Sequence, residues 1–252
     1  MIGEAPARPR FGRPLVRLDE ATSTNDLARC LADAGVAEGA VVVAARQTRG
    51  RGRLGRPWAS PPGGLWCSVL LRPGGGPPGL LSLAVGVAAA EAVEAAGVPA
   101  ALRWPNDVLV AGRKVAGVLL EAAGAAVVAG VGINVRVALE ALPAEAAAGA
   151  TSLHLHTRDV APEAVLASLL GRLEHWYGQW TRDPAAVVAA WSVRDALRGR
   201  PVRAAGAEPV EGTAEGITAD GALVVRGPDG RPRTVVAGDV SLAAGRSAPH
   251  GV

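Results

Sequence analysis

Lys114 is the residue of this chain best suited to contact a reacting anion, because it is the only lysine beside twenty-five arginines. A lysine ammonium is a compact point charge with three rotatable donors, whereas the arginine guanidinium is a planar fork. A carboxylate or acyl phosphate that reacts needs the first kind of cation. Arginine is the default cation of this chain, so we interpret Lys114 as a group retained for chemistry. The alternative is a surface lysine that was retained by chance.

A basic, glycine-rich loop spans residues 46–58 and opens with Gln47, one of only two glutamines. Its glycines let the backbone approach a ligand and expose amide donors. Its arginines can grip phosphate or carboxylate with two parallel hydrogen bonds. No carboxylate lies nearby in the sequence, so we expect the arginines to repel one another and the loop to order only around an anion.

Two other interpretations of this loop compete with an anion-binding site. An RGG-like segment binds nucleic acid without sequence preference, but such segments are repetitive, whereas this loop lies between two apolar runs, at 41–43 and 65–71. A phosphate-binding P-loop is excluded, because the chain contains no Gly-x-x-x-x-Gly-Lys-Ser/Thr run.

The sequence Trp104-Pro105-Asn106-Asp107 predicts a rigid corner between strands, with an amide and a carboxylate at its tip. The amide can grip a ligand oxygen, and the carboxylate can hold a metal ion or orient a cation. A purely structural turn is the alternative. Lys114 follows seven residues later, and Gly117 leaves room for a ligand beside its strand. The small residues at 130–134, which end in Asn134, suit a wall for a ring or a ribose.

Composition sets the outer limits. The chain has 252 residues, enough for one substantial domain with a small appendage, and 49% of them are apolar. A net charge of +3 favours anionic ligands. Cys30 and Cys67 make no secreted-type disulfide framework, and Cys67 lies in an apolar run that predicts a buried thiol. No signal core is found, and no apolar span runs uninterrupted for the roughly twenty residues that a membrane helix needs, so we expect a soluble, cytoplasmic protein without a membrane partner.

The elements that must position these residues form an α+β pattern, a mixed sheet with packed helices. We expect a loose tail at 1–14, a helix from a Thr22 or Ser23 cap to about residue 34, and a loop at 138–149. Further expected helices cover 80–96 and 162–197, with Trp176, Trp180 and Trp191 as anchors. Expected strands cover residues 41–43, 65–71, 108–110, 115–121 and 127–135.

After Gly199 the pattern changes to short strands separated by hairpin signals at Asp220-Gly221 and Asp229-Gly230. We expect a small β-barrel there. Its predicted strands cover residues 201–204, 210–217, 223–226, 233–236 and 240–242.

Together and in this order, the motifs resemble the biotin–protein ligases. The resemblance covers residues 23–25, 47–58, 104–121 and 130–134, and extends loosely to Arg200-Pro201-Val202. It implies a class II synthetase-like catalytic domain with a C-terminal SH3-like barrel. The implied divisions are a tail at 1–14, the catalytic domain at 15–197, the barrel at 198–245 and a tail at 246–252.

The family joins biotin and ATP into biotinyl-5′-AMP and then passes biotin to one lysine of a carrier domain in a biotin-dependent carboxylase. The resemblance implies a biotin site formed by Ser23, Thr24, Asn25, Gln47, Gly50, Arg51, Gly52, Arg53, Lys114 and Gly117. It implies a nucleotide site formed by Arg53, Arg56, Trp58, Asn106, Lys114 and Asn134. Catalysis would rest on Lys114, Arg51 and Arg53, with Asp107 holding Mg²⁺. A carboxylate that attacks phosphorus needs such charge neutralisation in a dry, preorganised site.

Three positions depart from the family pattern. Arg49 stands where alanine is usual, and Arg103 where lysine is usual. Ala150 stands where some members place a tryptophan over adenine, so the adenine contact is open. Only 22 residues precede Ser23, which leaves no room for a winged-helix domain, so we expect no DNA partner. We expect a monomer or a weak homodimer.

Two other functions compete with this interpretation. A lipoate–protein ligase shares the fold and the adenylate chemistry, but its arginine–serine–glycine-rich loop is not found here. A basic nucleic-acid-binding module rests on the single basic loop, and its affinity would depend steeply on salt.

Overall fold

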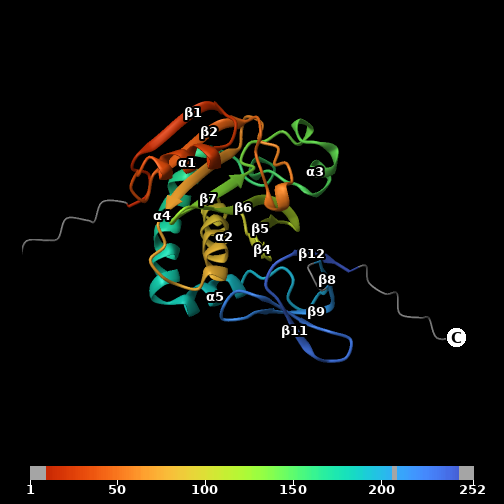
Figure 1. The fold of residues 1–252 in the computed structure, drawn as a ribbon. Helices are drawn as coiled ribbons and strands as arrows, with labels where there is room; N and C mark the ends of the chain where they lie inside the picture. Colours follow the sequence, from red (N-terminus) through yellow and green to blue (C-terminus); the bar gives the residue numbers. More distant parts are fainter. Residues whose placement is uncertain (1–9, 206–208, 244–252) are drawn as a thin grey trace, which may run out of the picture.

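The computed structural model describes residues 10–205 and 209–243, and its larger part is a seven-stranded mixed sheet (Figure 1). The strands lie in the order β1-β2-β3-β7-β6-β5-β4, and within this sheet only β1 and β2 pair in parallel. The predicted α+β class is confirmed. The strands are β1 (Leu15–Ala21), β2 (Val41–Gln47), β3 (Leu65–Leu71), β4 (Ala101–Arg103), β5 (Asp107–Val110), β6 (Arg113–Ala123) and β7 (Ala126–Ile133).

Helices cover both faces of this sheet, and β3 shows how its side chains divide between them. Alternate apolar residues from Leu65 to Leu71 belong to the core cluster of α2 (Pro78–Glu94). Leu70 belongs to a second cluster, with α1 (Thr24–Asp33). Successive side chains of a strand point to opposite faces, so an apolar run such as this one is buried on both sides. Burial raises the pKa of the Cys67 thiol to about 12, as expected for an inert, enclosed cysteine.

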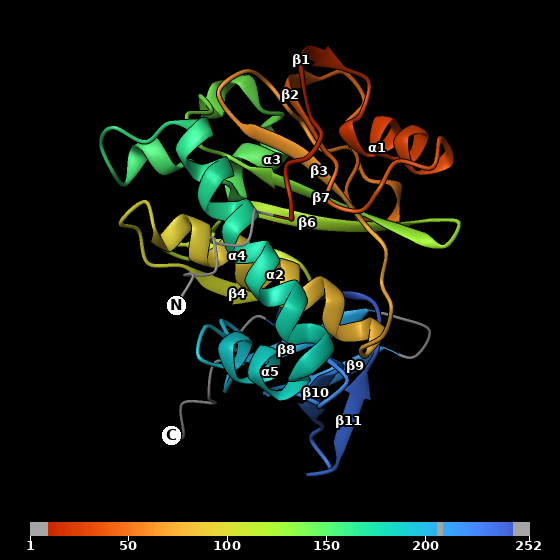
Figure 2. The same ribbon diagram turned by 90° about the vertical axis from the view of Figure 1, so that its left-hand side faces the viewer.

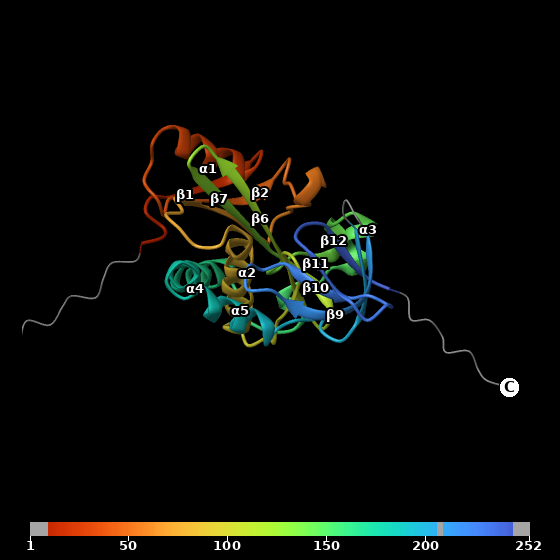
Figure 3. The same ribbon diagram turned by 60° about the horizontal axis from the view of Figure 1, so that its bottom comes forward.

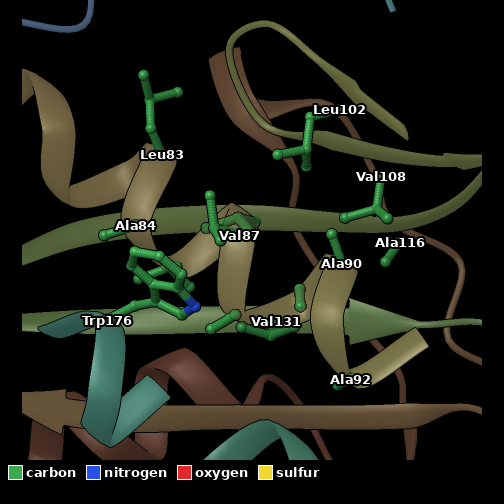
Figure 4. Packing of buried hydrophobic residues seen from close by; sticks show 14 of the residues in the cluster. Leu83, Ala84, Val87, Ala90, Ala92, Leu102, Val108, Ala116, Val131 and Trp176 are labelled. Atoms are coloured by element: carbon green, nitrogen blue, oxygen red, sulfur yellow. The ribbon is translucent and has the colours of Figure 1, made fainter. Parts of the chain in front are cut away.

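The outer helical layer consists of α4 (Pro162–Arg182) and α5 (Pro184–Ser192), which pack on α2 (Figure 2). Trp176 of α4 lies close to Ala84 of α2 in the core (Figure 4). The three tryptophans predicted as anchors are all buried, and Trp191 is only 1% exposed.

The continuous helical pattern expected at 162–197 is broken at Asp183. Pro184 begins α5, and the Asp183 carboxylate caps it by accepting a hydrogen bond from Ala186 N. Proline is favoured at the first position of a helix because its missing N–H is not needed there. The second break follows Ser192, where α5 ends.

Residues 10–14 are attached to the seven-stranded sheet and its helices, in contrast to the loose tail expected at 1–14. Phe11 is 3% exposed and its ring lies 5.8 Å from that of Tyr177. Gly12 N donates to the carbonyl of Gly39. Residues 1–9 and the expected tail at 246–252 lie outside the described residues.

A second, five-stranded antiparallel sheet follows, in the order β11-β10-β9-β8-β12. The predicted hairpin glycines, Gly221 and Gly230, have φ values of 85° and 76°, the left-handed region that glycine tolerates. The strands are β8 (Pro201–Ala205), β9 (Val210–Ile217), β10 (Leu223–Arg226), β11 (Pro232–Val235) and β12 (Asp239–Leu242). The short strands expected there are confirmed to within two residues at each end.

The five-stranded sheet forms the expected small barrel, which is attached to the Trp-Pro-Asn-Asp corner of the seven-stranded sheet. Trp104 Nε1 donates to the carbonyl of Gly221 at 2.9 Å. Gly79, in the first turn of α2, approaches Asp220 so closely that a Cβ there would lie 2.4 Å from its carbonyl oxygen. The residue that opens the Trp-Pro-Asn-Asp corner therefore also positions the barrel. Along the described part of the chain, no helix has both the length and the apolar character needed to cross a bilayer.

Candidate active site

One cavity of about 710 Å³ brings together every predicted site residue except Gly50. Its walls come from the start of α1, the basic loop, the corner before β5, and the middle of β6 and β7. The helix α3 (Ala144–Gly149) and β12 of the barrel complete it, and Figure 3 shows both on the same side of the molecule. The site is thus formed by segments from most of the chain.

The deep end of the cavity is polar and starts at Thr24. Thr24 N and Oγ1 both donate to Gln47 Oε1, at 2.8 and 3.1 Å, and Gln47 Nε2 donates to Ser60 Oγ at 2.8 Å. Ser23 occupies the N-cap position of α1, but its side chain makes no capping hydrogen bond. The expectation of a hydroxyl cap is therefore wrong, because the Gln47 amide replaces it. Gly50 packs against these hydrogen-bonded side chains. A Cβ on Gly50 would lie 2.4 Å from Trp58 O and 2.7 Å from Ser60 Oγ.

Asn25 is held by two partners, the buried Ser68 and the half-buried Glu121. Its amide oxygen accepts from Ser68 Oγ at 2.5 Å, and its amide nitrogen donates to Glu121 Oε2 at 2.6 Å. Gly130 lies directly behind it, since a Cβ there would be 2.3 Å from Asn25 Oδ1. Ser68 is a site residue that sequence reasoning missed. Its signal was available, because it is the only hydroxyl in the apolar run at 65–71.

The arginines of the loop meet carboxylates from distant parts of the chain. Arg51 donates two hydrogen bonds to Asp26, at 2.9 and 2.6 Å, and one to Glu121 at 3.4 Å. These hydrogen bonds with Arg51 hold the pKa of the Asp26 carboxyl below its usual value. The mutual repulsion expected of the arginines is therefore offset at Arg51 by carboxylates that are distant in the sequence. Proximity in sequence was the wrong measure, because α1 and β6 supply both carboxylates.

Two further arginines of the loop reach the barrel. Arg53 Nη2 donates to the carbonyl of Gly238 at 3.1 Å, and Arg56 Nη2 donates to Asp239 Oδ1 at 2.8 Å. Burial lowers the pKa of the Arg53 guanidinium. Arg53 Nη1 is buried without a partner within the described structure. Because buried donors are almost always paired, this nitrogen is available to an anion in the cavity.

Lys114 lies between a carboxylate and an aromatic face. Its Nζ is 2.5 Å from Asp107 Oδ1 and 4.9 Å from the centroid of the Trp58 ring. The Trp58 ring in turn covers two glycines of the sheet: a Cβ would meet it at 3.1 Å on Gly117 and at 2.7 Å on Gly132. A side chain at either glycine would therefore displace the Trp58 ring from this position.

The predicted nucleotide-side amides hold the walls of the cavity. Asn106 Nδ2 donates to Val118 O at 2.8 Å, and Asn134 Nδ2 donates to Thr151 O at 3.0 Å. The loop expected at 138–149 contains a 3₁₀ turn (Leu139–Ala141) and α3, which is a correction to the sequence-based expectation. Buried Ala150 follows, and no aromatic side chain stands there.

Asp107 does not fit a metal ion held by the protein. Its second oxygen lies 2.5 Å from Arg103 Nη2, so both oxygens face cations. Among residues 10–205 and 209–243, no group of three or more His, Cys, Asp or Glu side chains could hold a metal ion. A nucleotide-borne Mg²⁺ needs only one or two free carboxylates from the protein, but both oxygens of Asp107 are already occupied by cations.

The geometry defines an enzyme site for an acidic substrate: a neutral, hydrogen-bonding deep end and a cationic mouth formed by Lys114, Arg53 and Arg56. The comparisons with known proteins agree. Residues 18–137 match the Biotin/lipoate A/B protein ligase family, and residues 198–243 match the Biotin protein ligase C terminal domain.

The biotin–[acetyl-CoA-carboxylase] ligase of Paracoccus denitrificans is 40% identical over 225 residues, which cover 83% of this chain and 92% of that protein. That of Mycobacterium tuberculosis is 38% identical over 231 residues, covering 87% and 84%. The biotin protein ligase from Aquifex aeolicus, solved with biotin and ATP, superimposes with a TM-score of 0.82 at 32% identity, covering 92% and 99%. The chain belongs to the biotin protein ligases.

Proposed function

We propose that this protein activates biotin with ATP and transfers it to a lysine of a biotin carboxyl carrier protein. In the first step the biotin carboxylate attacks the α-phosphorus of ATP, forming biotinyl-5′-AMP and releasing pyrophosphate. In the second step the carrier amine attacks the acyl carbon and AMP leaves. The observation that carries the proposal is the single cavity in which a neutral polar end and Lys114, Arg53 and Arg56 meet.

The cations of the mouth answer the main electrostatic problem of the first step. A carboxylate must approach a phosphate of like charge, and two unit charges 4 Å apart repel by about 4 kcal/mol at an effective dielectric constant of about 20. Lys114 would lie between the two anions and Arg53 would close over them. A fixed cation acts without reorganising at the moment of reaction.

The neutral end of the cavity would hold the biotin rings. The Thr24–Gln47–Ser60 hydrogen-bond chain presents polar groups without charge, which suits a ureido ring. The Trp58 ring, which the resemblance assigns to the nucleotide side, lies over Gly117 and Gly132 and would also present an apolar surface to the biotin rings. Biotin combines both kinds of surface with one carboxylate.

Mg²⁺ would enter as part of the nucleotide. This ion commonly keeps several waters and binds through substrate phosphates. Since Asp107 faces two cations, we derive no step through a protein-held metal. Every residue expected in the site except Gly50 lines this cavity, so we further propose that a monomer is competent, alone or in a weak homodimer.

Pyrophosphate release tests the proposal. The purified protein with ATP and Mg²⁺ should release pyrophosphate on addition of biotin, and then biotinylate an apo carrier domain, which streptavidin blotting detects. Lipoate with ATP is the matched comparison, because the matched family also includes lipoate ligases. Release with lipoate but not with biotin would favour the lipoate alternative.

A further inference from the structure

The Asp107 carboxylate holds two cations, and the proposed reaction gives it no other role. Oδ1 lies 2.5 Å from Lys114 Nζ and Oδ2 lies 2.5 Å from Arg103 Nη2. The Asp107 side chain is 13% exposed, against 28% for Lys114 and 35% for Arg103. The carboxylate is therefore the most enclosed of the three groups, and its partners stand between it and solvent.

The backbone fixes this carboxylate before any ligand binds. Asp107 begins β5 and pairs with Gly117 of β6. Immediately before it, Asn106 makes two hydrogen bonds with Val118: its carbonyl accepts from Val118 N at 3.0 Å, and its Nδ2 donates to Val118 O. These contacts attach the corner before β5 to Gly117 and Val118 of β6, so the position of the carboxylate is set by the backbone.

Lys114 can reach that carboxylate because of a β-bulge and a glycine. The register of β5 and β6 shifts between Val108 and Leu109, and Leu109 pairs with Lys114. Gly117 then leaves the path open, since a Cβ there would lie 3.2 Å from Lys114 Cε. The ammonium thus lies against the Asp107 carboxylate and the Trp58 ring, with Gly117 beside its Cε.

We propose that Asp107 is a positioning residue, which holds the Lys114 ammonium for the attack on ATP, and that it is not a metal ligand. This inference rests on the proposed function. A displacement of about 1 Å from the productive geometry can cost about 100-fold in rate. Loss of the carboxylate should therefore affect the chemical step through Lys114 and leave the dependence on Mg²⁺ unchanged.

The test measures biotin-dependent pyrophosphate release at fixed ATP over a range of Mg²⁺ concentrations. Asp107→Asn should lower kcat about 10- to 100-fold, with the half-saturating Mg²⁺ concentration within about twofold of the parent. Asp229→Asn is the matched control, because it removes a carboxylate from an exposed ion pair of the barrel. If Asp107→Asn does not fold, Asp107→Glu serves instead, since it keeps a carboxylate but displaces the ammonium.

A double-mutant cycle separates positioning from a general structural role. If Asp107 acts through Lys114, Asp107→Asn should cost less than about threefold further in a Lys114→Gln background. Three outcomes would overturn the inference: unchanged kcat, equal losses in both backgrounds, or a half-saturating Mg²⁺ concentration raised about tenfold with kcat restored at high Mg²⁺. A parent protein that releases no pyrophosphate with biotin would instead overturn the proposed function.

Discussion

Close contacts with neighbouring groups fix the positions of single side chains in this site, and Lys114 is an example. Its ammonium lies between the Asp107 carboxylate and the Trp58 ring, and Gly117 leaves room for its Cε. A cation held in this way is preorganised for charge that develops during a reaction. A guanidinium is larger and planar, so it cannot occupy the same position.

Lys114→Arg should retain the charge and lose most adenylate formation. We expect the barrier to rise by about 2–4 kcal/mol, comparable to the loss of one preorganised donor. Pyrophosphate release by the purified variant measures this, with the exposed substitution Arg158→Lys as the opposite exchange on the surface. A rate close to that of the parent would show that only charge matters at this position.

Gly50→Ala should weaken biotin binding, because its Cβ would lie 2.4 Å from Trp58 O and 2.7 Å from Ser60 Oγ. Overpacking of this kind typically costs about 1–3 kcal/mol, so we expect the Kd for biotin to rise about tenfold or more. Titration calorimetry checks this. Gly74→Ala is the control, since a Cβ there would meet nothing within 4 Å, and equal affinities for both variants would contradict the packing argument.

The sequence predicted which residues gather in the site better than what each one contacts. Rare residue types marked Lys114, Gln47 and the three asparagines, and the cavity unites them. Their partners could not be predicted, because hydrogen bonds such as Asn25 to Glu121 join residues far apart in the sequence. Such contacts arise from packing of α1 on the sheet, which local patterns do not encode.

At the scale of elements, the basic loop is held at two ends. Arg51 binds Asp26 of α1, and Arg56 binds Asp239 of β12. The second pair is exposed, so it should contribute less than about 1 kcal/mol. The attachment of Arg56 to the barrel is therefore weak enough to open.

Asp239→Asn should make the loop easier to open. Because the lost ion pair contributes less than about 1 kcal/mol, trypsin should cut after Arg53 about two- to fivefold faster than in the parent. Bound biotin with ATP should slow cutting in both proteins. Asp229→Asn, which removes an exposed ion pair elsewhere in the barrel, is the control. Equal cutting of all three proteins would show that the barrel does not restrain the loop.

Asp195, in the turn after α5, should make stability depend on pH. Burial raises the pKa of its carboxyl above the usual 3.8, and Oδ2 is buried without a partner among the described residues. The folded chain then binds its proton more tightly than the unfolded chain, so the free energy of unfolding falls as pH rises through the folded-state pKa.

Asp195→Asn removes the loss of folding stability that ionisation of this carboxyl causes, and it can keep the hydrogen bond from Leu197 N. We expect the Tm to rise by about 2–4 °C at neutral pH, with a smaller difference near pH 4. Thermal unfolding of both proteins across that range checks this. A Tm difference that does not vary with pH would contradict the titration argument.

Elements with strong local patterns were predictable and weak ones were not. Apolar runs and hairpin glycines predicted β3, β7 and the strands of the barrel. β1 is an edge strand with mostly exposed or half-buried residues, and β4 has only three residues. Neither strand has a clear alternation of apolar and polar residues, so pairing with neighbouring strands determines that these residues form strands.

At the scale of the whole molecule, the scarcity of lysine has a chemical consequence. A leaked acyl-adenylate reacts with unprotonated amines. This chain offers only Lys114, which is ion-paired with Asp107, and the terminal amine of Met1. The enzyme should therefore modify itself little.

Arg158→Lys combined with Arg182→Lys places two lysines on exposed positions. After equal turnover with biotin and ATP, streptavidin blotting should show several-fold more label on this variant than on the parent. Arg158→Gln combined with Arg182→Gln controls for the loss of the arginines. Comparable labelling of parent and lysine variant would show that lysine scarcity gives no protection.

The adenylate itself is the most direct evidence for the proposed chemistry. Native mass spectrometry of the protein after incubation with biotin, ATP and Mg²⁺ should detect bound biotinyl-5′-AMP. The same signal should be absent with lipoate, and much reduced in Lys114→Arg. A protein that binds biotin and ATP but forms no adenylate, or forms one from lipoate alone, would contradict the account.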